Sequence, residues 1–339
     1  MLNRRLIVLC VVALMSGYFA QPASAQSYWG CISYATGIIQ PFPIGVFGCV
    51  YQIFSFGSFT CYYHNHCVPA AGPTETPRTC PNCQAGSPIS LVTGNTYIEE
   101  TDVRIPGLSN GLTLVRTWNS EWPSTQTAFQ TGIFGPNWRS SYEERIFVGA
   151  DNYTKYSRSD GSFWSFEGIG SMSVAAPSDM VATLSVNSTW TQWILKFQNG
   201  EQRTFDYTSG WLTSIIDRNG NTTQLTYDGI NRLTTVTDPG GRHLYFGYQN
   251  NSSYLVTSVT SDVGISLSYA YDSQGRLLQV TNPDLTTLSF AYDSNSLITS
   301  VTDSNGKILE SHTYDSQARG LTSSRANGVE AVTVSYGTN

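Results

Sequence analysis

Charged side chains are scarce in this 339-residue sequence, of which only 12% is Asp, Glu, Lys or Arg, against about 25% in an average soluble domain. None occurs between Arg5 and Glu75, and no cluster of Lys and Arg follows. Nucleic-acid binding requires a basic surface. We therefore expect no nucleic-acid partner.

The sequence also lacks the motifs of common enzymes. It contains no nucleophile elbow, no phosphate-binding loop and no HExxH helix. Glu99, Glu100 and Asp102 could form the paired carboxylates of glycoside hydrolysis, but we favour a solvent-facing or turn-setting role for them. The chain is expected to be no enzyme and to need no cofactor.

A secretory signal is indicated at the N-terminus. Arg4 and Arg5 precede an apolar run, residues 6–20, which is short for a membrane span of about 20 residues. Ala23-Ser24-Ala25 is a small-x-small cleavage site. We expect cleavage after Ala25 and a secreted, periplasmic or cell-surface protein, whose formal charge falls from −6 to −8 when both arginines leave.

Cleavage would leave six cysteines, all before residue 84. In an exported chain an even number of cysteines indicates disulfides, with fifteen pairings open. The disulfide candidates are Cys31, Cys49, Cys61, Cys67, Cys80 and Cys83. Zinc is the alternative for His64, His66 and the last three cysteines, since Cys-x-x-Cys is a known half-site.

Composition divides the chain into four expected parts. They are a signal peptide (1–25), a cysteine-rich cap and linker (26–85), a β-domain (86–205) and a repeat region (206–339). In the cap, residues 37–60 are apolar but broken by proline and glycine, so a disulfide-stapled cap is favoured over a membrane-contacting segment. In the β-domain, residues 111–118 alternate as a half-buried strand does.

An aromatic residue recurs every 21 to 23 positions in the repeat region. It stands at Phe205, Tyr227, Tyr248, Tyr271, Tyr292 and Tyr314, and Tyr336 continues the series. Aspartate follows at Asp206, Asp228, Asp272, Asp293 and Asp315, whereas Gln249 follows Tyr248. So regular a period indicates one structural unit repeated.

One repeat has the pattern of a β-hairpin. Residues 265–271 alternate with period two, and an aspartate then opens a turn that a glycine completes. A second alternating strand and a second turn complete about 22 residues. Such a hairpin is unstable alone, but stacked hairpins share a continuous face.

The position two before the repeat aromatic is mostly apolar, as a packed face requires. It holds Arg203, Leu225, Phe246, Tyr269, Phe290 and His312. We interpret His312 as a core histidine that is stacked or hydrogen-bonded, and the segment starting Asp238-Pro-Gly-Gly as an ordinary repeat turn. Tyr and Trp are expected to fill the packed face, with a carbohydrate-binding surface as the alternative.

The sequence resembles the YD-repeat proteins of the Rhs family. "YDSQGRLLQVTNPDLTTLSFAYD" matches the repeat, and "GSPISLVTGNTY", "EETDVRIPGL", "LTLVRTWNS" and "FGPNWRSSYEE" resemble the domain that precedes it. The resemblance implies an all-β fold in which the repeats spiral into a hollow shell around a C-terminal toxin. It carries over no enzyme, and the expected architecture is an N-terminal β-domain followed by an open, partial shell.

The repeats present are too few to enclose a toxin alone. A toxin of about 100 residues needs a cavity of roughly 20 Å radius, whose wall measures about 5,000 Å². Six hairpins cover about 1,150 Å², near a quarter of it. We therefore expect an exported scaffold whose open edge is completed by downstream chain or a protein partner; the alternative is an adhesin for carbohydrate or a cell surface.

Overall fold

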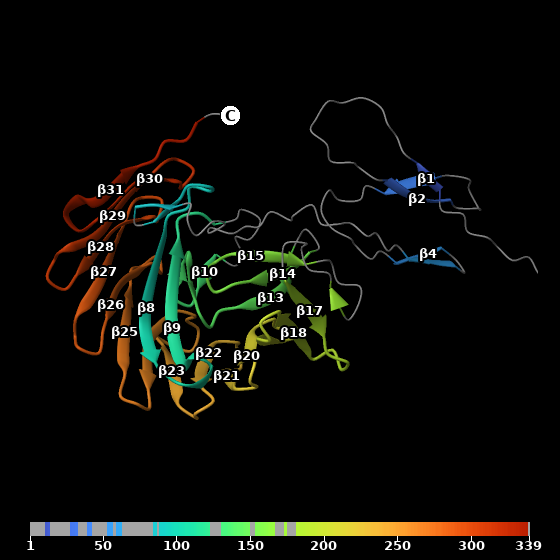
Figure 1. Ribbon diagram of the computed structural model, residues 1–339, viewed down its shortest axis with the longest axis horizontal. Helices are drawn as coiled ribbons and strands as arrows, with labels where there is room; N and C mark the ends of the chain where they lie inside the picture. The colour runs from blue at the N-terminus through green and yellow to red at the C-terminus, as the bar shows by residue number, and fades with distance from the viewer. Residues whose placement is uncertain are drawn as a thin grey trace, which may run out of the picture.

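The computed structural model describes residues 84–86, 88–122, 130–149, 153–166 and 181–337, together with several short strand segments outside these ranges. Figure 1 shows that the described chain is built of strands, which confirms the all-β prediction. None of the described residues belongs to a helix that could cross a membrane.

The first strands form two small sheets ahead of residue 84. They are β1 (Val11–Ala13), β2 (Tyr28–Ile32), β3 (Ile39–Phe42), β4 (Ile53–Phe56) and β5 (Phe59–Tyr62). The first three pair in the order β1-β2-β3, and β4 pairs with β5.

Within the expected β-domain, 86–205, the residues up to 166 contain two three-stranded antiparallel sheets, β12-β9-β8 and β13-β14-β15, whereas the strands from residue 173 onward belong to the large sheet described below. The name β-domain is used from here on for residues 86–166. Its elements are β6 (Gln84–Ala85), β7 (Ile89–Ser90), β8 (Tyr97–Ile105), the 3-10 turn η1 (Leu108–Asn110), β9 (Leu112–Asn119), β10 (Thr131–Gly132), β11 (Gly135–Pro136), β12 (Trp138–Ser140), β13 (Arg145–Val148), β14 (Thr154–Ser157) and β15 (Phe163–Phe166). The alternating stretch 111–118 lies in β9, as its pattern predicts.

A 16-stranded antiparallel sheet contains the rest of the chain, with its strands in sequence order from β16 to β31. Its strands are β16 (Ser173–Val174), β17 (Ala182–Val186), β18 (Gln192–Phe197), β19 (Gln202–Asp206), β20 (Leu212–Ile216), β21 (Thr222–Tyr227), β22 (Leu233–Thr237), β23 (His243–Tyr248), β24 (Val256–Ser261), β25 (Ser266–Tyr271), β26 (Leu277–Thr281), β27 (Thr287–Tyr292), β28 (Ile298–Asp303), β29 (Ile308–Tyr314), β30 (Gly320–Arg325) and β31 (Val329–Thr333), with η3 (Ala326–Gly328) before the last. The stacked hairpins inferred from the 22-residue period are confirmed.

The two faces of this sheet differ because the strands alternate apolar and polar residues. Leu225, Val236 and Leu244 are cross-strand neighbours on one face and are buried. On the other face the neighbours include Ser258 and Ser268, and hydroxyl side chains dominate there. Only one face therefore needs a covering layer.

The β-domain supplies that layer. Figure 1 shows β8 and β9 lying within the curve of the large sheet. Aromatic rings meet across the junction at 4.8 Å for Phe134 and Tyr269 and at 5.3 Å for Trp138 and Phe290. The positions two before the repeat tyrosines thus pack as the sequence predicts, but against the preceding domain.

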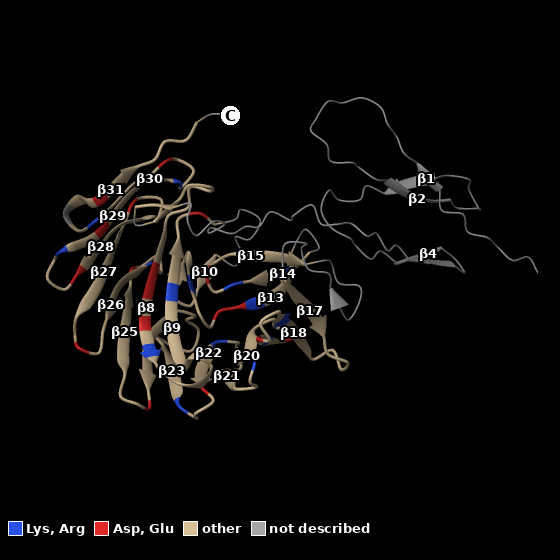
Figure 2. Cartoon of the chain, in the orientation of Figure 1, with Lys and Arg blue, Asp and Glu red and all other residues tan. Residues whose placement is uncertain are grey.

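The sheet is not closed. Among the described strands, β31 pairs only with β30. Figure 2 shows that Lys, Arg, Asp and Glu are sparse along the sheet and lie mostly near its turns and strand ends.

Gly210 fixes the place where the β-domain meets the first hairpin. Its φ is +73° in the turn after β19, and the Ile146 N–H donates to its carbonyl at 2.8 Å. A Cβ there would collide with the Ile146 carbonyl oxygen. By contrast, Gly220 (φ +84°) has no heavy atom within 4 Å of an added Cβ.

Replacing Gly210 by alanine is expected to lower the free energy of unfolding by about 3 kcal/mol, because left-handed strain adds to a backbone collision. Gly220→Ala carries the strain alone and should cost about 1 kcal/mol. Urea unfolding of the two variants measures the difference. Equal losses would show that the Gly210 contact is dispensable.

Candidate functional site

The repeat tyrosines join neighbouring hairpins. The Tyr271 hydroxyl donates to the Val256 carbonyl, 15 residues back in the preceding hairpin, at 2.7 Å. The series Tyr227, Tyr248, Tyr271, Tyr292, Tyr314 and Tyr336 donates to the carbonyl oxygens of Leu212, Leu233, Val256, Leu277, Ile298 and Gly320 at 2.6–2.8 Å. Each tyrosine ring packs against the core of the sheet, and its hydroxyl bonds its hairpin to the preceding one.

The aspartate after the tyrosine holds the turn. Asp272 Oδ1 accepts from the N–H groups of Gln274 and Arg276, each at 2.9 Å. Burial opposes its ionisation, but the hydrogen bonds from Arg276 hold the pKa of Asp272 below its ordinary value. Equivalent turns begin at Asp228, Asp293 and Asp315.

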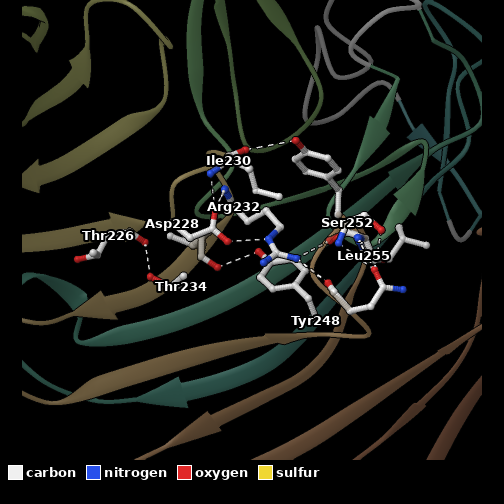
Figure 3. A network of polar contacts seen from close by, with 12 residues as sticks. Thr226, Asp228, Ile230, Arg232, Thr234, Tyr248, Ser252 and Leu255 are labelled. Carbon is white, nitrogen blue, oxygen red and sulfur yellow. Dashed lines mark hydrogen bonds and ion pairs between the residues drawn. The ribbon is translucent and has the colours of Figure 1, made fainter.

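An arginine four residues after the aspartate completes the joint, and sequence reasoning missed it. Figure 3 shows Arg232 between Asp228 and Tyr248. Its Nε lies 2.7 Å from Asp228 Oδ2, and its guanidinium carbon is 4.6 Å from the Tyr248 ring centroid. Arg276 and Arg319 repeat the arrangement. The recurring Asp-x-x-x-Arg spacing was the available signal.

A buried ion pair lies between the β-domain and the sheet. Arg116 of β9 is fully buried and binds Asp102 of β8 through Nε–Oδ2 (2.5 Å) and Nη2–Oδ1 (2.8 Å). Tyr269 of β25 donates to the same carboxylate at 2.8 Å. The Trp138 ring centroid is 4.7 Å from the guanidinium carbon. Asp102, one of three candidate carboxylates, thus serves a junction between domains.

Burial acts differently on the two other carboxylates of β8. Glu99 is exposed, whereas Glu100 is half-buried. Burial raises the pKa of Glu100 to about 7; Arg116 opposes the rise, and Asp102 and Glu310 add to it. The Glu100 carboxyl, beside the Arg116–Asp102 pair, therefore keeps its proton to a higher pH than an ordinary glutamate does.

His312 lies on the packed face and is 2% exposed. Its Nε2 is 3.4 Å from the Glu310 carboxylate, and its ring centroid is 6.5 Å from that of Tyr314. The buried position agrees with the core histidine that we inferred, but the ring is tilted at 37° to that of Tyr314 and neither ring nitrogen forms a hydrogen bond with the described residues. The Asp238 turn has the ordinary repeat form, in which Oδ1 accepts from the Gly240 and Arg242 N–H groups at 2.9 Å.

The structure does not test the prediction that the six cysteines form disulfides. Cys49, Cys67, Cys80 and Cys83 lie outside the described residues, while Cys31 and Cys61 fall in β2 and β5, whose side chains are not described. His64 and His66 are also outside. In the described part of the chain, no group of His, Cys, Asp and Glu could hold a metal ion.

Most aromatic side chains of the described ranges fill the core, as expected. Three remain open to solvent on the sheet and its turns: Trp190 is 43% exposed, Tyr245 42% and Tyr254 55%. Tyr245 stacks on His243 with 5.5 Å between ring centroids.

Two family models match the chain. The model described as "Domain of unknown function (DUF6531)" matches residues 86–166, and "RHS Repeat" matches residues 205–243, 255–287 and 271–308. The matches fall on the β-domain and on the hairpins of the large sheet.

The curated relatives are much longer proteins. The chain is 28% identical over 146 residues to the tRNA nuclease WapA of Bacillus subtilis strain 168. It is 29% identical over 146 residues to the tRNA3(Ser)-specific nuclease WapA of Bacillus spizizenii. Each match covers 43% of this chain and 6% of the relative.

Solved structures that resemble the chain come from Tc toxin assemblies. The Tc holotoxin pore of Photorhabdus luminescens matches at a TM-score of 0.27 and 15% identity, over 69% of this chain and 10% of that one. The TcdB2-TccC3 structure matches at 0.27 and 16%, over 70% and 12%.

Replacing Arg116 by methionine is expected to lower the free energy of unfolding by about 3–5 kcal/mol, because Asp102 would stay buried without its cation. The double variant Arg116→Met/Asp102→Leu should recover part of that loss. Arg325→Met, at an exposed position, is the control and should stay within about 0.5 kcal/mol of the parent. Chemical denaturation gives all three values, and a loss no larger than the control's would refute the role of the pair.

Stability should fall as pH rises from about 4.5 to about 7. The folded chain holds the Glu100 proton to a higher pH than the unfolded chain does, so this group favours folding most in acid. The change is of the order of 1–3 kcal/mol. Glu100→Gln should reduce the difference in unfolding free energy between pH 5 and pH 8.

Glu99→Gln is the matched control and should keep the full pH dependence. Burial also raises the pKa of Glu121 to about 7, so part of the slope should remain in Glu100→Gln. An unchanged slope in Glu100→Gln would contradict the assignment.

Proposed function

Because the chain belongs to the Rhs/YD-repeat family, we propose that it is an exported, non-enzymatic scaffold related to the shells of polymorphic toxins. One observation carries the proposal. The same Tyr-Asp joint builds hairpin after hairpin into a single sheet, so that the repeated residues serve architecture. Hydrolysis of RNA or glycan by the purified chain would contradict the non-enzymatic part.

The hairpins present support a partial wall. Twelve six-residue strands cover about 1,150 Å², near a quarter of what a cargo of about 100 residues needs. The chain spans about 6% of the WapA relatives that it matches. We propose that downstream chain or a protein partner extends the sheet.

Strand β31 is the place for that extension. The Val334 N–H donates to the Leu321 carbonyl at 2.8 Å. Because N–H groups alternate sides along a strand, the Thr333 N–H points away from β30. This edge offers backbone donors and acceptors to another strand.

The proposed export rests on the signal-like N-terminus and its expected cleavage after Ala25. A mature N-terminus at Gln26, read by Edman degradation of protein from the culture fluid or periplasm, checks it. Disulfides among the six remaining cysteines belong to the same proposal, since an exported chain meets oxidising conditions.

Glycan or cell-surface binding is the second candidate. Its support is the small set of exposed aromatic rings, Trp190, Tyr245 and Tyr254, next to a sheet face rich in hydroxyl groups. Amphipathic rings of this kind stack on apolar faces of other molecules while keeping a polar tip in water. A nucleic-acid partner is not proposed, because the chain carries a net charge of −6.

A hairpin added after β31 should be accepted as a further repeat. We expect a copy of residues 293–314, appended after Tyr336, to slow amide exchange of Ala331 and Thr333 at least tenfold, because their backbone groups gain strand partners. Hydrogen exchange followed by mass spectrometry measures this.

A scrambled appendage of the same composition is the control for added mass. Thr333→Pro removes an edge donor and should block the gain in the extended chain. If the genuine copy protects the edge no better than the scrambled one, the sheet is not an extendable scaffold.

A further inference from the structure

Four aliphatic side chains are exposed along one rim of the large sheet. The strands β24 to β31 lie side by side in sequence order, so alternate turns share a rim (Figure 1). Each of the four turns that close these hairpins carries one of the exposed residues in the turn or just after it: Val263, Leu285, Ile308 and Val329. They recur every 21 to 23 residues, as the repeat does, and we call these four residues the rim row.

Leu285 occupies a turn position at which its neighbours have glycine. Its turn and the two beside it are each closed by the N–H of the fourth residue, which donates to the carbonyl of the first at 2.9–3.3 Å. That fourth residue is Gly264 (φ +88°) in the turn before and Gly306 (φ +77°) in the turn after, whereas Leu285 itself has φ +68°. A left-handed backbone is unfavourable for a residue with a Cβ, and a side chain that is 81% exposed gains little from burial to offset it. Uncompensated strain of this kind points to a role outside folding.

A net negative charge surrounds the rim row. Its turns contain four acidic and two basic residues, a formal charge of −2, over residues 261–265, 282–286, 303–308 and 325–330. Asp284, directly before Leu285, is exposed; it accepts from the Thr286 N–H and hydroxyl at 3.0 and 2.6 Å and forms no ion pair among the described residues. A second copy of the chain or an anionic bilayer would bring like charge against these turns. The complementary occupant is an apolar surface that carries lysine or arginine.

The spacing of the rim row fits a helix better than a strand. Successive turns at one rim are two strands apart, which is about 9.6 Å. On an α-helix an apolar stripe recurs every seven residues, or about 10.5 Å, whereas side chains on one face of an extended chain recur every 6.8 Å or so. Four turns span about 29 Å, which is the length of a helix of about 20 residues.

The β-domain already contacts this rim one turn earlier. The turn 238–242 contains no valine, leucine or isoleucine. The loop that holds Gly107 lies against it, because a Cβ on Gly107 would collide with the Arg242 side chain. The rim row begins with Val263, in the next turn. A partner on the row would therefore continue an interface that the chain itself begins.

We propose that the rim row binds an amphipathic α-helix of a partner protein, with lysine or arginine beside its apolar stripe. The stripe packs over Leu285 and the three other residues of the row, and the cations face Asp284 and the other carboxylates of the turns. The inference goes beyond both proposed functions, since it uses side chains at the turns rather than the backbone edge of β31 or a glycan site.

Binding of a designed peptide to the purified chain tests this inference. The probe is a fluorescent peptide of about 20 residues, made of leucine and lysine so that the leucines fall on one face of a helix. Fluorescence anisotropy at physiological salt should show binding in the micromolar range. A peptide of the same composition in scrambled order, and one with glutamate in place of lysine, should each bind at least tenfold more weakly.

Leu285→Gly should weaken binding of the leucine–lysine peptide at least tenfold. Because glycine relieves the left-handed strain, the same variant should keep or raise the parent's urea midpoint, so the loss of binding cannot come from unfolding. Asp284→Asn keeps an acceptor for Thr286 and should weaken the peptide at least twofold, with the difference fading at high salt. Leu91→Gly, at an exposed leucine outside the row, is the matched control and should stay within twofold of the parent.

Several outcomes would overturn the inference. Peptide binding that survives Leu285→Gly would remove the rim row as the site, and equal binding of the glutamate peptide would remove the basic partner. No binding of the leucine–lysine peptide at millimolar concentration would refute the docking site itself. A parent dimer that Leu285→Gly dissolves in analytical ultracentrifugation would replace the helix by a second copy. Binding to phosphatidylcholine vesicles that Leu285→Gly abolishes would replace it by a bilayer. The scaffold proposal depends on the hairpin extension and is unaffected by any of these results.

Discussion

The Arg116–Asp102 pair lies at the contact between the β-domain and the repeat sheet, and the architecture depends on that contact. The repeat sheet has one apolar face that its own hairpins cannot cover. The β-domain covers it with aromatic rings, and within them Arg116 binds Asp102 while Tyr269 of the sheet binds the same carboxylate. A buried charge tolerates little displacement, so the pair fixes the register in which one layer lies on the other.

Within the sheet, the same set of local hydrogen bonds holds each hairpin in place. Tyrosine reaches back to the preceding hairpin, aspartate closes the turn ahead, and arginine joins the two where it is present. The residue just before the acceptor carbonyl is an arginine in three hairpins, whereas it is Leu255 or Leu297 in two others. The hydroxyl bond persists at both places, so the tyrosine is the constant element and the arginine an addition.

Sequence reasoning predicted the repeated strands and turns, but it missed the recurring arginine and the contacts between the two domains. The period, the strand pattern and the turn role of Asp272 follow from local chemistry, so they were readable. Arg116 carried a signal as well, since it falls on the same face of its strand as Leu114 and Trp118. The carboxylate that binds Arg116, however, also accepts from Tyr269, which lies on a strand 167 residues after Asp102. Pairings at such separation depend on how the two layers stack, and no local sequence pattern encodes that stacking.

The backward reach of the tyrosine hydroxyl gives the array a direction. Each hairpin donates to a carbonyl that lies earlier in the chain and never requires a later hairpin to complete that bond. A chain emerging N-terminus first meets its acceptors already in place, and the β-domain that covers the hairpins has emerged before them. Such a sheet can therefore grow one hairpin at a time, each added to the hairpin before it. A sheet that ends at any repeat has all of its tyrosine bonds formed, and its last strand is an edge to which the next hairpin can pair.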